Sequence, residues 1–219
     1  MASVASPFGL RPINLIGGQA FNGGVIREYK VASNNSAAIF NGDLVVLSSA
    51  GLPSAVGSSP VAIDIPNAAN GTAGIVGVCV GARYVDSTGI VQYRQFLPAN
   101  AITAGFTEVY VRVMDDPDAL FQIQGTAALG TFNSGTDGSG WPGAIGKNAA
   151  LGFGTAGSTT TGNSGVNLVV GANGSSLATT TTLAVRIVDV VDGTQTDDYP
   201  EFIVKLNVGV HSYNNPLGV

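Results

Sequence analysis

The chain has 219 residues, of which 45% are hydrophobic and only 11% are charged, and its formal net charge at pH 7 is -5. Soluble domains usually carry roughly 25–35% charged residues on their surfaces, so this composition disfavours a free-standing enzyme and favours a structural or binding protein. The few Lys and Arg residues form no basic stripe, which argues against nucleic-acid binding, and no apolar run is long enough for a membrane-spanning helix.

The first 24 residues predict an extended N-terminal arm, because prolines and several glycines alternate with apolar residues there. The segment has neither the basic start nor the apolar stretch of a secretory signal peptide. An arm of this kind stays disordered unless it docks. We expect Phe8, Leu10, Arg11 and Ile13 to anchor it on a partner, and the alternative is that it covers an edge strand of its own sheet.

Short segments rich in apolar and β-branched residues recur along the rest of the chain, separated by prolines and by pairs such as Asn-Gly and Thr-Gly. This spacing is typical of an all-β barrel or sandwich of short antiparallel strands. With only three Glu and three Lys, a long amphipathic helix would have little polar surface. In chain order, the predicted strands are residues 25–31, 43–47, 61–65, 75–81, 90–96, 107–114, 166–170, 183–191 and 201–210.

Three of these segments alternate strictly between the two faces of a strand, which is the pattern of a half-buried sheet. In residues 107–114, three valines share one face, and the other face carries Glu108, Tyr110 and Arg112. Residues 183–191 and 201–210 alternate in the same way, and Asp192-Gly193 supplies a turn signal between them. We therefore predict that the last two strands are antiparallel neighbours joined by a polar loop.

Residues 125–182 are rich in Gly, Ser and Thr but also contain apolar anchors such as Leu151, Phe153 and Leu168. A pure linker lacks such anchors. We predict a loop-rich insertion with one or two strands, within a single β domain of residues 25–219. The lone cysteine, Cys79, excludes an intramolecular disulfide, and its apolar surroundings predict a buried, inert thiol.

Several short patterns could carry chemistry, but each has a simpler interpretation. Residues 152–157 match G-x-G-x-x-G, yet a poor helix start follows them. Ser164 and His211 would form a triad only with a geometry that sequence does not supply, and the carboxylates of residues 115–118 and 197–198 lack an EF-hand spacing. We predict no catalytic residue, no cofactor and no metal, with Ser164 and Asp115 in turns and His211 as a terminal polar residue.

Five segments resemble capsid decoration, or cement, proteins of tailed bacteriophages. They are SPFGLRPI at residues 6–13, IFNGDLVVL at 39–47, GIVGV at 74–78, GSTTTGNS at 157–164 and IVKLN at 203–207. The stretch 42–78 is also similar to the small β-barrel unit of lambdoid head-decoration proteins.

The resemblance implies a non-enzymatic virion protein that binds the outer surface of the capsid and stabilises the head by bridging capsomers. Its partners would be the major capsid protein and further copies of the chain, with a trimer favoured, and neither nucleic acid nor membrane. Low charge fits such an assembly, because like charges repeated around a shell repel one another.

Two alternatives stay open. The first is another virion component, such as a minor capsid, tail or fibre protein, or a shell-forming subunit. The second is a carbohydrate-binding or adhesive β domain, which the Ser/Thr/Gly-rich surface favours. Against it, Trp141 is the only strong stacking platform in the sequence, and it lies in the turn-like segment 140–143.

Overall fold

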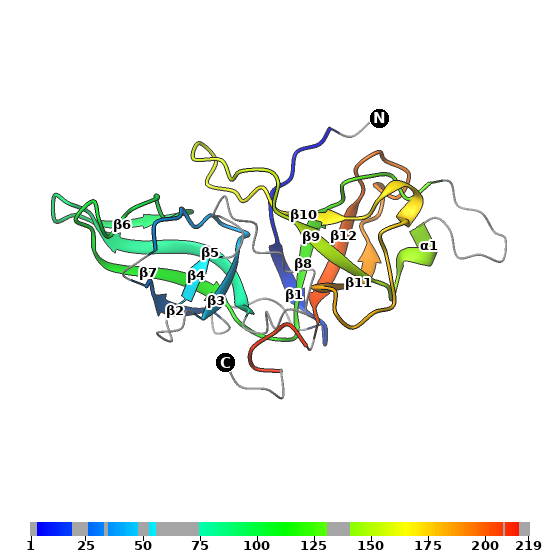
Figure 1. Cartoon of the computed structure of the whole chain (residues 1–219), viewed down its shortest axis with the longest axis horizontal. Helices are drawn as coiled ribbons and strands as arrows, with labels where there is room; N and C mark the ends of the chain where they lie inside the picture. The colour runs from blue at the N-terminus through cyan, green and yellow to red at the C-terminus, as the bar shows by residue number, and fades with distance from the viewer. Residues whose placement is uncertain are drawn as a thin grey trace.

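The computed structural model describes residues 4–18, 26–32, 35–47, 53–55, 75–130, 141–207 and 209–214. Their regular structure is almost entirely β-strand, in two antiparallel sheets that lie toward opposite ends of the long axis (Figure 1). The predicted all-β class is confirmed. Within the described residues neither sheet closes on itself, so the fold is consistent with a sandwich of short strands and is not a closed barrel.

Sheet A contains both of the strands predicted to be neighbours near the C-terminus. In spatial order it consists of β1 (Arg11–Leu15), β8 (Ala119–Gln124), β12 (Glu201–Leu206), β11 (Val185–Val190), β9 (Asn148–Gly152) and β10 (Asn167–Val169). The one-turn helix α1 (Trp141–Ala144) and a 3-10 turn at Ala172–Gly174 lie in its connections. The antiparallel pairing of β11 with β12 confirms that prediction, and Phe202, Val204 and Leu206 are buried on one face of β12.

Sheet B follows the order β2 (Ile26–Lys30), β7 (Thr107–Met114), β5 (Ile75–Val85), β3 (Leu44–Leu47) and β4 (Pro53–Ala55), and β6 (Val91–Arg94) pairs with β5. Successive side chains of a strand point to opposite faces, and the inner half of β5 is buried on both. The pairing of β5 with β3 skips Val76, and this bulge interrupts the alternation. Ile75 and Val78 therefore both join the larger hydrophobic core, whereas Val76 and Cys79 join a second core on the other face. This double burial explains the nearly continuous apolar run of residues 75–80.

The larger core connects the two sheets. It combines Phe121 and Phe202 of sheet A with Leu44 and Met114 of sheet B. The second core lies on the opposite face of sheet B and is covered by loop residues, including Ile39, Leu97 and Ala101. Cys79 is free and fully buried within it, and burial raises the pKa of its thiol to about 12, so the thiol is protonated at neutral pH.

Several strand predictions differ in extent from the structure. Residues 201–210 form a strand only to Leu206, because the Asn207 side chain donates to the Leu183 carbonyl (2.6 Å) and a turn returns Val210 N to the Asn207 carbonyl (3.0 Å). Predicted strand 61–65 lies outside the described residues. Strands β1, β4, β8 and β9 were not predicted. The described part of the Gly/Ser/Thr-rich segment contains two strands, β9 and β10, and both are integral to sheet A.

Candidate interaction surface

The N-terminal arm docks on its own chain. Residues 11–15 form β1, which pairs with β8 at the edge of sheet A. Of the four predicted anchors, Leu10 is fully buried in the larger core, Phe8 and Ile13 are half-buried, and Arg11 is exposed. The Arg11 guanidinium lies 4.5 Å from the centre of the Phe8 ring. Phe8, Arg11 and Ile13 therefore remain accessible to a partner, whereas Leu10 packs in the core and stabilises the fold. The partner-binding role of the arm stays a prediction.

Three of the segments that carry the family resemblance meet at one place, here called the glycine junction (residues 8–10, 40–43 and 162–166). Gly9 and Gly42 have φ angles of +77° and +94°, and a Cβ on Gly9 would lie 2.9 Å from Gly42 Cα. Main-chain hydrogen bonds join all three segments: Leu10 N donates to the Gly42 carbonyl (3.0 Å), and Ser164 N donates to the Asn41 carbonyl (2.8 Å). The backbones approach so closely that the junction has no room for larger residues at these glycines.

Asp43 and Ser164 form a buried pair at the centre of the glycine junction. Ser164 Oγ donates to Asp43 Oδ1 (2.5 Å), and Phe40 N donates to Asp43 Oδ2 (2.8 Å). Burial raises the pKa of the Asp43 carboxyl to about 6, although both hydrogen bonds act to lower it. The predicted turn residue Ser164 is thus a buried link between distant segments. Its hydroxyl is committed to a carboxylate, whereas His211 packs elsewhere against Tyr213, so the two do not form a triad.

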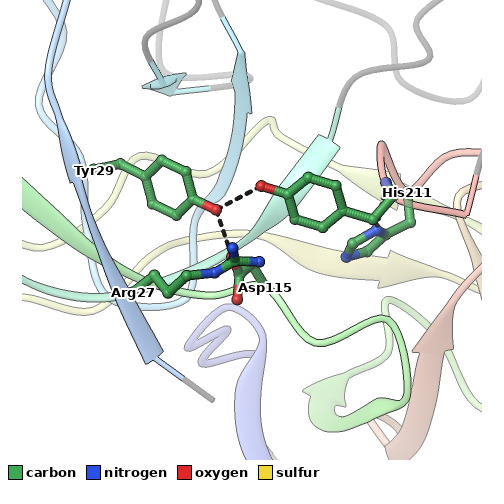
Figure 2. Close-up of polar contacts among 5 residues, drawn as sticks. Arg27, Tyr29, Asp115 and His211 are labelled. Atoms are coloured by element: carbon green, nitrogen blue, oxygen red, sulfur yellow. Dashed lines mark hydrogen bonds and ion pairs between the residues drawn. The ribbon is translucent and has the colours of Figure 1, made fainter. Parts of the chain in front are cut away.

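A second polar cluster joins β2, the turn after β7 and the C-terminal segment 209–214 (Figure 2). The Tyr29 hydroxyl donates to Asp115 Oδ2, and it lies 2.7 Å from the Tyr213 hydroxyl. Arg27 Nε lies 2.5 Å from the same Asp115 oxygen, and the Arg27 guanidinium lies 5.1 Å from the centre of the Tyr213 ring. Burial and the hydrogen bond to Asp115 raise the pKa of Tyr29, so this phenol stays protonated as a donor.

His211 belongs to the same cluster, and the prediction that it is a terminal polar residue is wrong. It is fully buried, and its Nδ1 accepts from Tyr213 N (3.2 Å). Burial lowers the pKa of its imidazole, which favours the neutral ring. The adjacent Ser212 N donates to the Ile75 carbonyl (2.7 Å), so the C-terminal segment is fastened to the start of β5. We interpret the cluster as a structural clasp.

Removing the Tyr29 hydroxyl tests that interpretation. We expect Tyr29→Phe to lower the free energy of unfolding by about 1–2 kcal/mol, because it removes the hydrogen bond from the phenol to the buried Asp115 carboxylate. The measurement is urea denaturation followed by circular dichroism. Tyr110→Phe is the matched control, because that hydroxyl makes no hydrogen bond within the described part of the chain. Equal losses in the two variants would argue against the clasp.

The outer half of sheet B leaves one face open to solvent. Four strands contribute one cross-strand row to it, in the order Tyr93, Arg83, Tyr110 and Lys30. The Arg83 guanidinium lies 4.6 Å from the centre of the Tyr110 ring and is within 3.4 Å of Glu28 and 3.3 Å of Glu108. At one end of this row Tyr93 is 69% exposed, and Val91, two residues before it in β6, is 51% exposed. We call these residues the open face: Glu28, Lys30, Arg83, Val91, Tyr93, Glu108 and Tyr110.

The alternation of residues 107–114 correctly placed Glu108 and Tyr110 on a face opposite the valines, but it did not reveal the strands beside them. Those neighbours come from pairings with β5 and β2, which lie well apart from β7 along the chain. The resulting surface combines exposed aromatic and apolar groups with partly neutralised charges. Such a surface is suited to binding another macromolecule.

The remaining candidate motifs have structural surroundings of their own. Residues 152–157 lead from β9 into a loop, where Gly157 packs so closely that a Cβ would lie 2.3 Å from the Phe40 ring. Trp141 is half-buried in α1 and packs against the larger core. Among the described residues, no three His, Cys, Asp or Glu side chains are grouped to hold a metal ion. The described helices include none that is long and apolar enough to cross a membrane.

No family model, curated protein or solved structure matches the chain.

Proposed function

We propose that this chain is a non-enzymatic decoration protein that binds the outer surface of a tailed-phage capsid and stabilises the head by bridging capsomers. Its partners are the major capsid protein and further copies of itself, and its location is the exterior of the virion. The observation that carries the proposal is the open face, since a soluble chain that leaves Val91 and Tyr93 exposed on an edge strand has a surface suited to a protein partner.

Bridging requires at least two separate contact surfaces on one molecule, and the chain offers two. Strand β6, which carries Val91 and Tyr93 of the open face, lies near the end of the molecule that is farther from sheet A, and the N-terminal arm leads away from the middle of the molecule (Figure 1). Val4 in the arm is 77% exposed. The ion pairs of Arg83 on the open face are partly exposed and contribute little to stability. They are available to orient a charged partner.

The direct test is to add purified protein to undecorated phage heads. We expect saturable binding and a higher temperature for loss of head integrity, because binding energy repeated over many copies stabilises the shell. Sedimentation of heads with bound protein measures the first result, and thermal release of packaged DNA measures the second. Absence of saturable binding would refute the proposal.

The open face has its own prediction. We expect the double substitution Val91→Ser and Tyr93→Ser to weaken binding to heads by roughly tenfold or more, since aromatic anchors dominate protein interfaces. The fold should stay intact, because both side chains are exposed. Ile145→Ser removes another exposed apolar residue, 41% accessible, from the connection after α1 and is the matched control. An equal effect of the control would show that the open face has no special role.

A carbohydrate-binding or adhesive domain is the second candidate, and the exposed ring of Tyr93 favours it. Trp141 does not add to this candidate, because it is half-buried against the core. Binding to glycans that Tyr93→Ser abolishes, without binding to heads, would support this candidate over decoration.

A further inference from the structure

A groove of about 350 Å³ lies between the N-terminal arm and sheet B. Its walls come from the arm, from β2, β5 and β7 and from the glycine junction, and they consist of Phe8, Arg11, Pro12, Ile26, Asn41, Val80, Arg112 and Asn163. Within the described residues, β1 and β2 are the end strands of their sheets, and both border the groove. An extended chain segment can therefore enter alongside two strand edges.

Two guanidinium groups, those of Arg11 and Arg112, line the groove, and none of its described lining residues is acidic. The ion pairs among described residues involve Arg27, Arg83 and Lys205 instead. Glu28 is opposite Arg112 in the β2–β7 register, but its carboxylate lies 3.4 Å from Arg83 Nε. In a chain with a net charge of -5, two guanidinium groups in one groove without a carboxylate partner among the described residues make the groove locally positive, and this charge is complementary to an acidic ligand.

We propose that this groove binds an extended acidic peptide segment, with its carboxylates on Arg11 and Arg112. Guanidinium groups bind carboxylates through paired hydrogen bonds. The amides of Asn41 and Asn163 supply donors and acceptors for a peptide backbone, and the apolar walls receive the side chains between the acids. A nucleic acid is disfavoured, because two cations neutralise few phosphates and the net negative charge of the chain repels a polyanion.

This inference rests on the proposed function, because it assigns the acidic segment to the capsid partner. It also gives two of the predicted arm anchors a chemical role: Arg11 binds a carboxylate, and Phe8, which lies beneath the Arg11 guanidinium, holds that group in place. Leu10 supports the site from the core without touching the ligand.

The test measures fluorescence polarisation of a labelled peptide of alternating Glu and Val residues. We expect Arg11→Gln and Arg112→Gln each to weaken binding by about tenfold, as the loss of a hydrogen-bonded charge pair requires, and high salt to weaken it further. A Gln-Val peptide should bind to the wild type as weakly as the Glu-Val peptide binds to the two groove variants. The matched control Arg94→Gln removes an exposed arginine outside the groove and should change affinity by less than about twofold.

Three results would overturn the proposal: equal binding of the Gln-Val peptide, no effect of the two groove substitutions, or an equal effect of Arg94→Gln. Complete displacement of the peptide by inorganic phosphate at matched ionic strength would also overturn it, because the groove would then be a simple anion site. Titration of heads separates this inference from the proposed function. If both groove variants bind heads as well as the wild type does, the groove is not the binding site for the capsid partner, but the proposed decoration function stands. If the protein binds the acidic peptide specifically but does not bind heads, the peptide site stands and the decoration function is refuted.

Discussion

Replacing Gly9 by Ala is expected to lower the free energy of unfolding by about 3–5 kcal/mol, which combines left-handed backbone strain with a steric clash. Gly9 has a φ angle of +77°, and a Cβ there would lie 2.6 Å from Ser164 Cβ and 2.9 Å from the Gly42 carbonyl oxygen. The Gly42 backbone cannot move aside as a flexible side chain can. The arm, the turn before β3 and the loop before β10 would therefore have to separate.

Gly18→Ala is the matched control for this prediction. Gly18 has almost the same φ angle, +76°, but a Cβ added there would have no other atom within 4 Å among the described residues. We expect this variant to lose only the backbone component, about 1 kcal/mol. Urea denaturation of both variants gives the comparison. Equal losses would mean that the three segments do not approach each other closely at Gly9.

The strands whose buried face could be predicted are those whose own side chains alternate. Residues 107–114 and 185–190 have one apolar face, and that pattern is local. Strand β8 also contains apolar residues, but the polar residues Gln122 and Gln124 among them hide from the sequence pattern that this strand is buried. Gln124 is 6% exposed because its side chain accepts from Ser6 N (2.7 Å) and donates to the Val4 carbonyl (3.2 Å). Those partners lie more than a hundred residues away, and no local pattern announces them.

Other strands were missed for different physical reasons. β1 contains Pro12, which disfavours a central strand but is acceptable at a sheet edge, and β1 is the end strand of sheet A. β9 contains two alanines, which have weak strand propensity, and it is held in the sheet by pairing with β10 and β11. In both cases the position within the sheet decides the conformation.

The roles of the polar residues in the two clusters could not be predicted for the same reason. Ser164 looks like a turn residue because it lies between Asn163 and Gly165, and His211 looks like a terminal one because it follows a predicted strand and precedes Asn214 and Asn215. Their partners come from other parts of the chain: 121 residues separate Asp43 from Ser164, and 184 separate Tyr29 from Tyr213. The short motifs FNGDLV and TGNS did carry a signal, since both contribute to the glycine junction, but which segment packs on which is a property of the fold.

The buried Asp43 carboxyl predicts that stability falls as the pH rises from about 3 to about 7. Its pKa is about 6 in the folded protein, against an ordinary value of 3.8. The folded state therefore binds the proton more tightly than the unfolded state, and stability is greatest while the group is protonated in both. As the pH passes through this interval the unfolded state ionises first, and about 3 kcal/mol of stability is lost.

Asp43→Asn isolates this effect, because an amide keeps the size and an acceptor for Phe40 N but does not titrate. We expect the stability of the wild type, relative to Asp43→Asn, to fall by about 3 kcal/mol between about pH 3 and about pH 7, measured by urea denaturation at each pH. The control is Asp86→Asn. Hydrogen bonds from Thr88, Gln92 and Ile90 lower the pKa of the Asp86 carboxyl to about 2, so ionisation of this group favours folding. The Asp86→Asn variant should therefore still lose stability as the pH rises, as the wild type does. The contrary result is a wild-type stability that, relative to Asp43→Asn, stays constant or rises over this pH interval. It would mean that the Asp43 carboxylate is better solvated than its burial beside Ser164 implies.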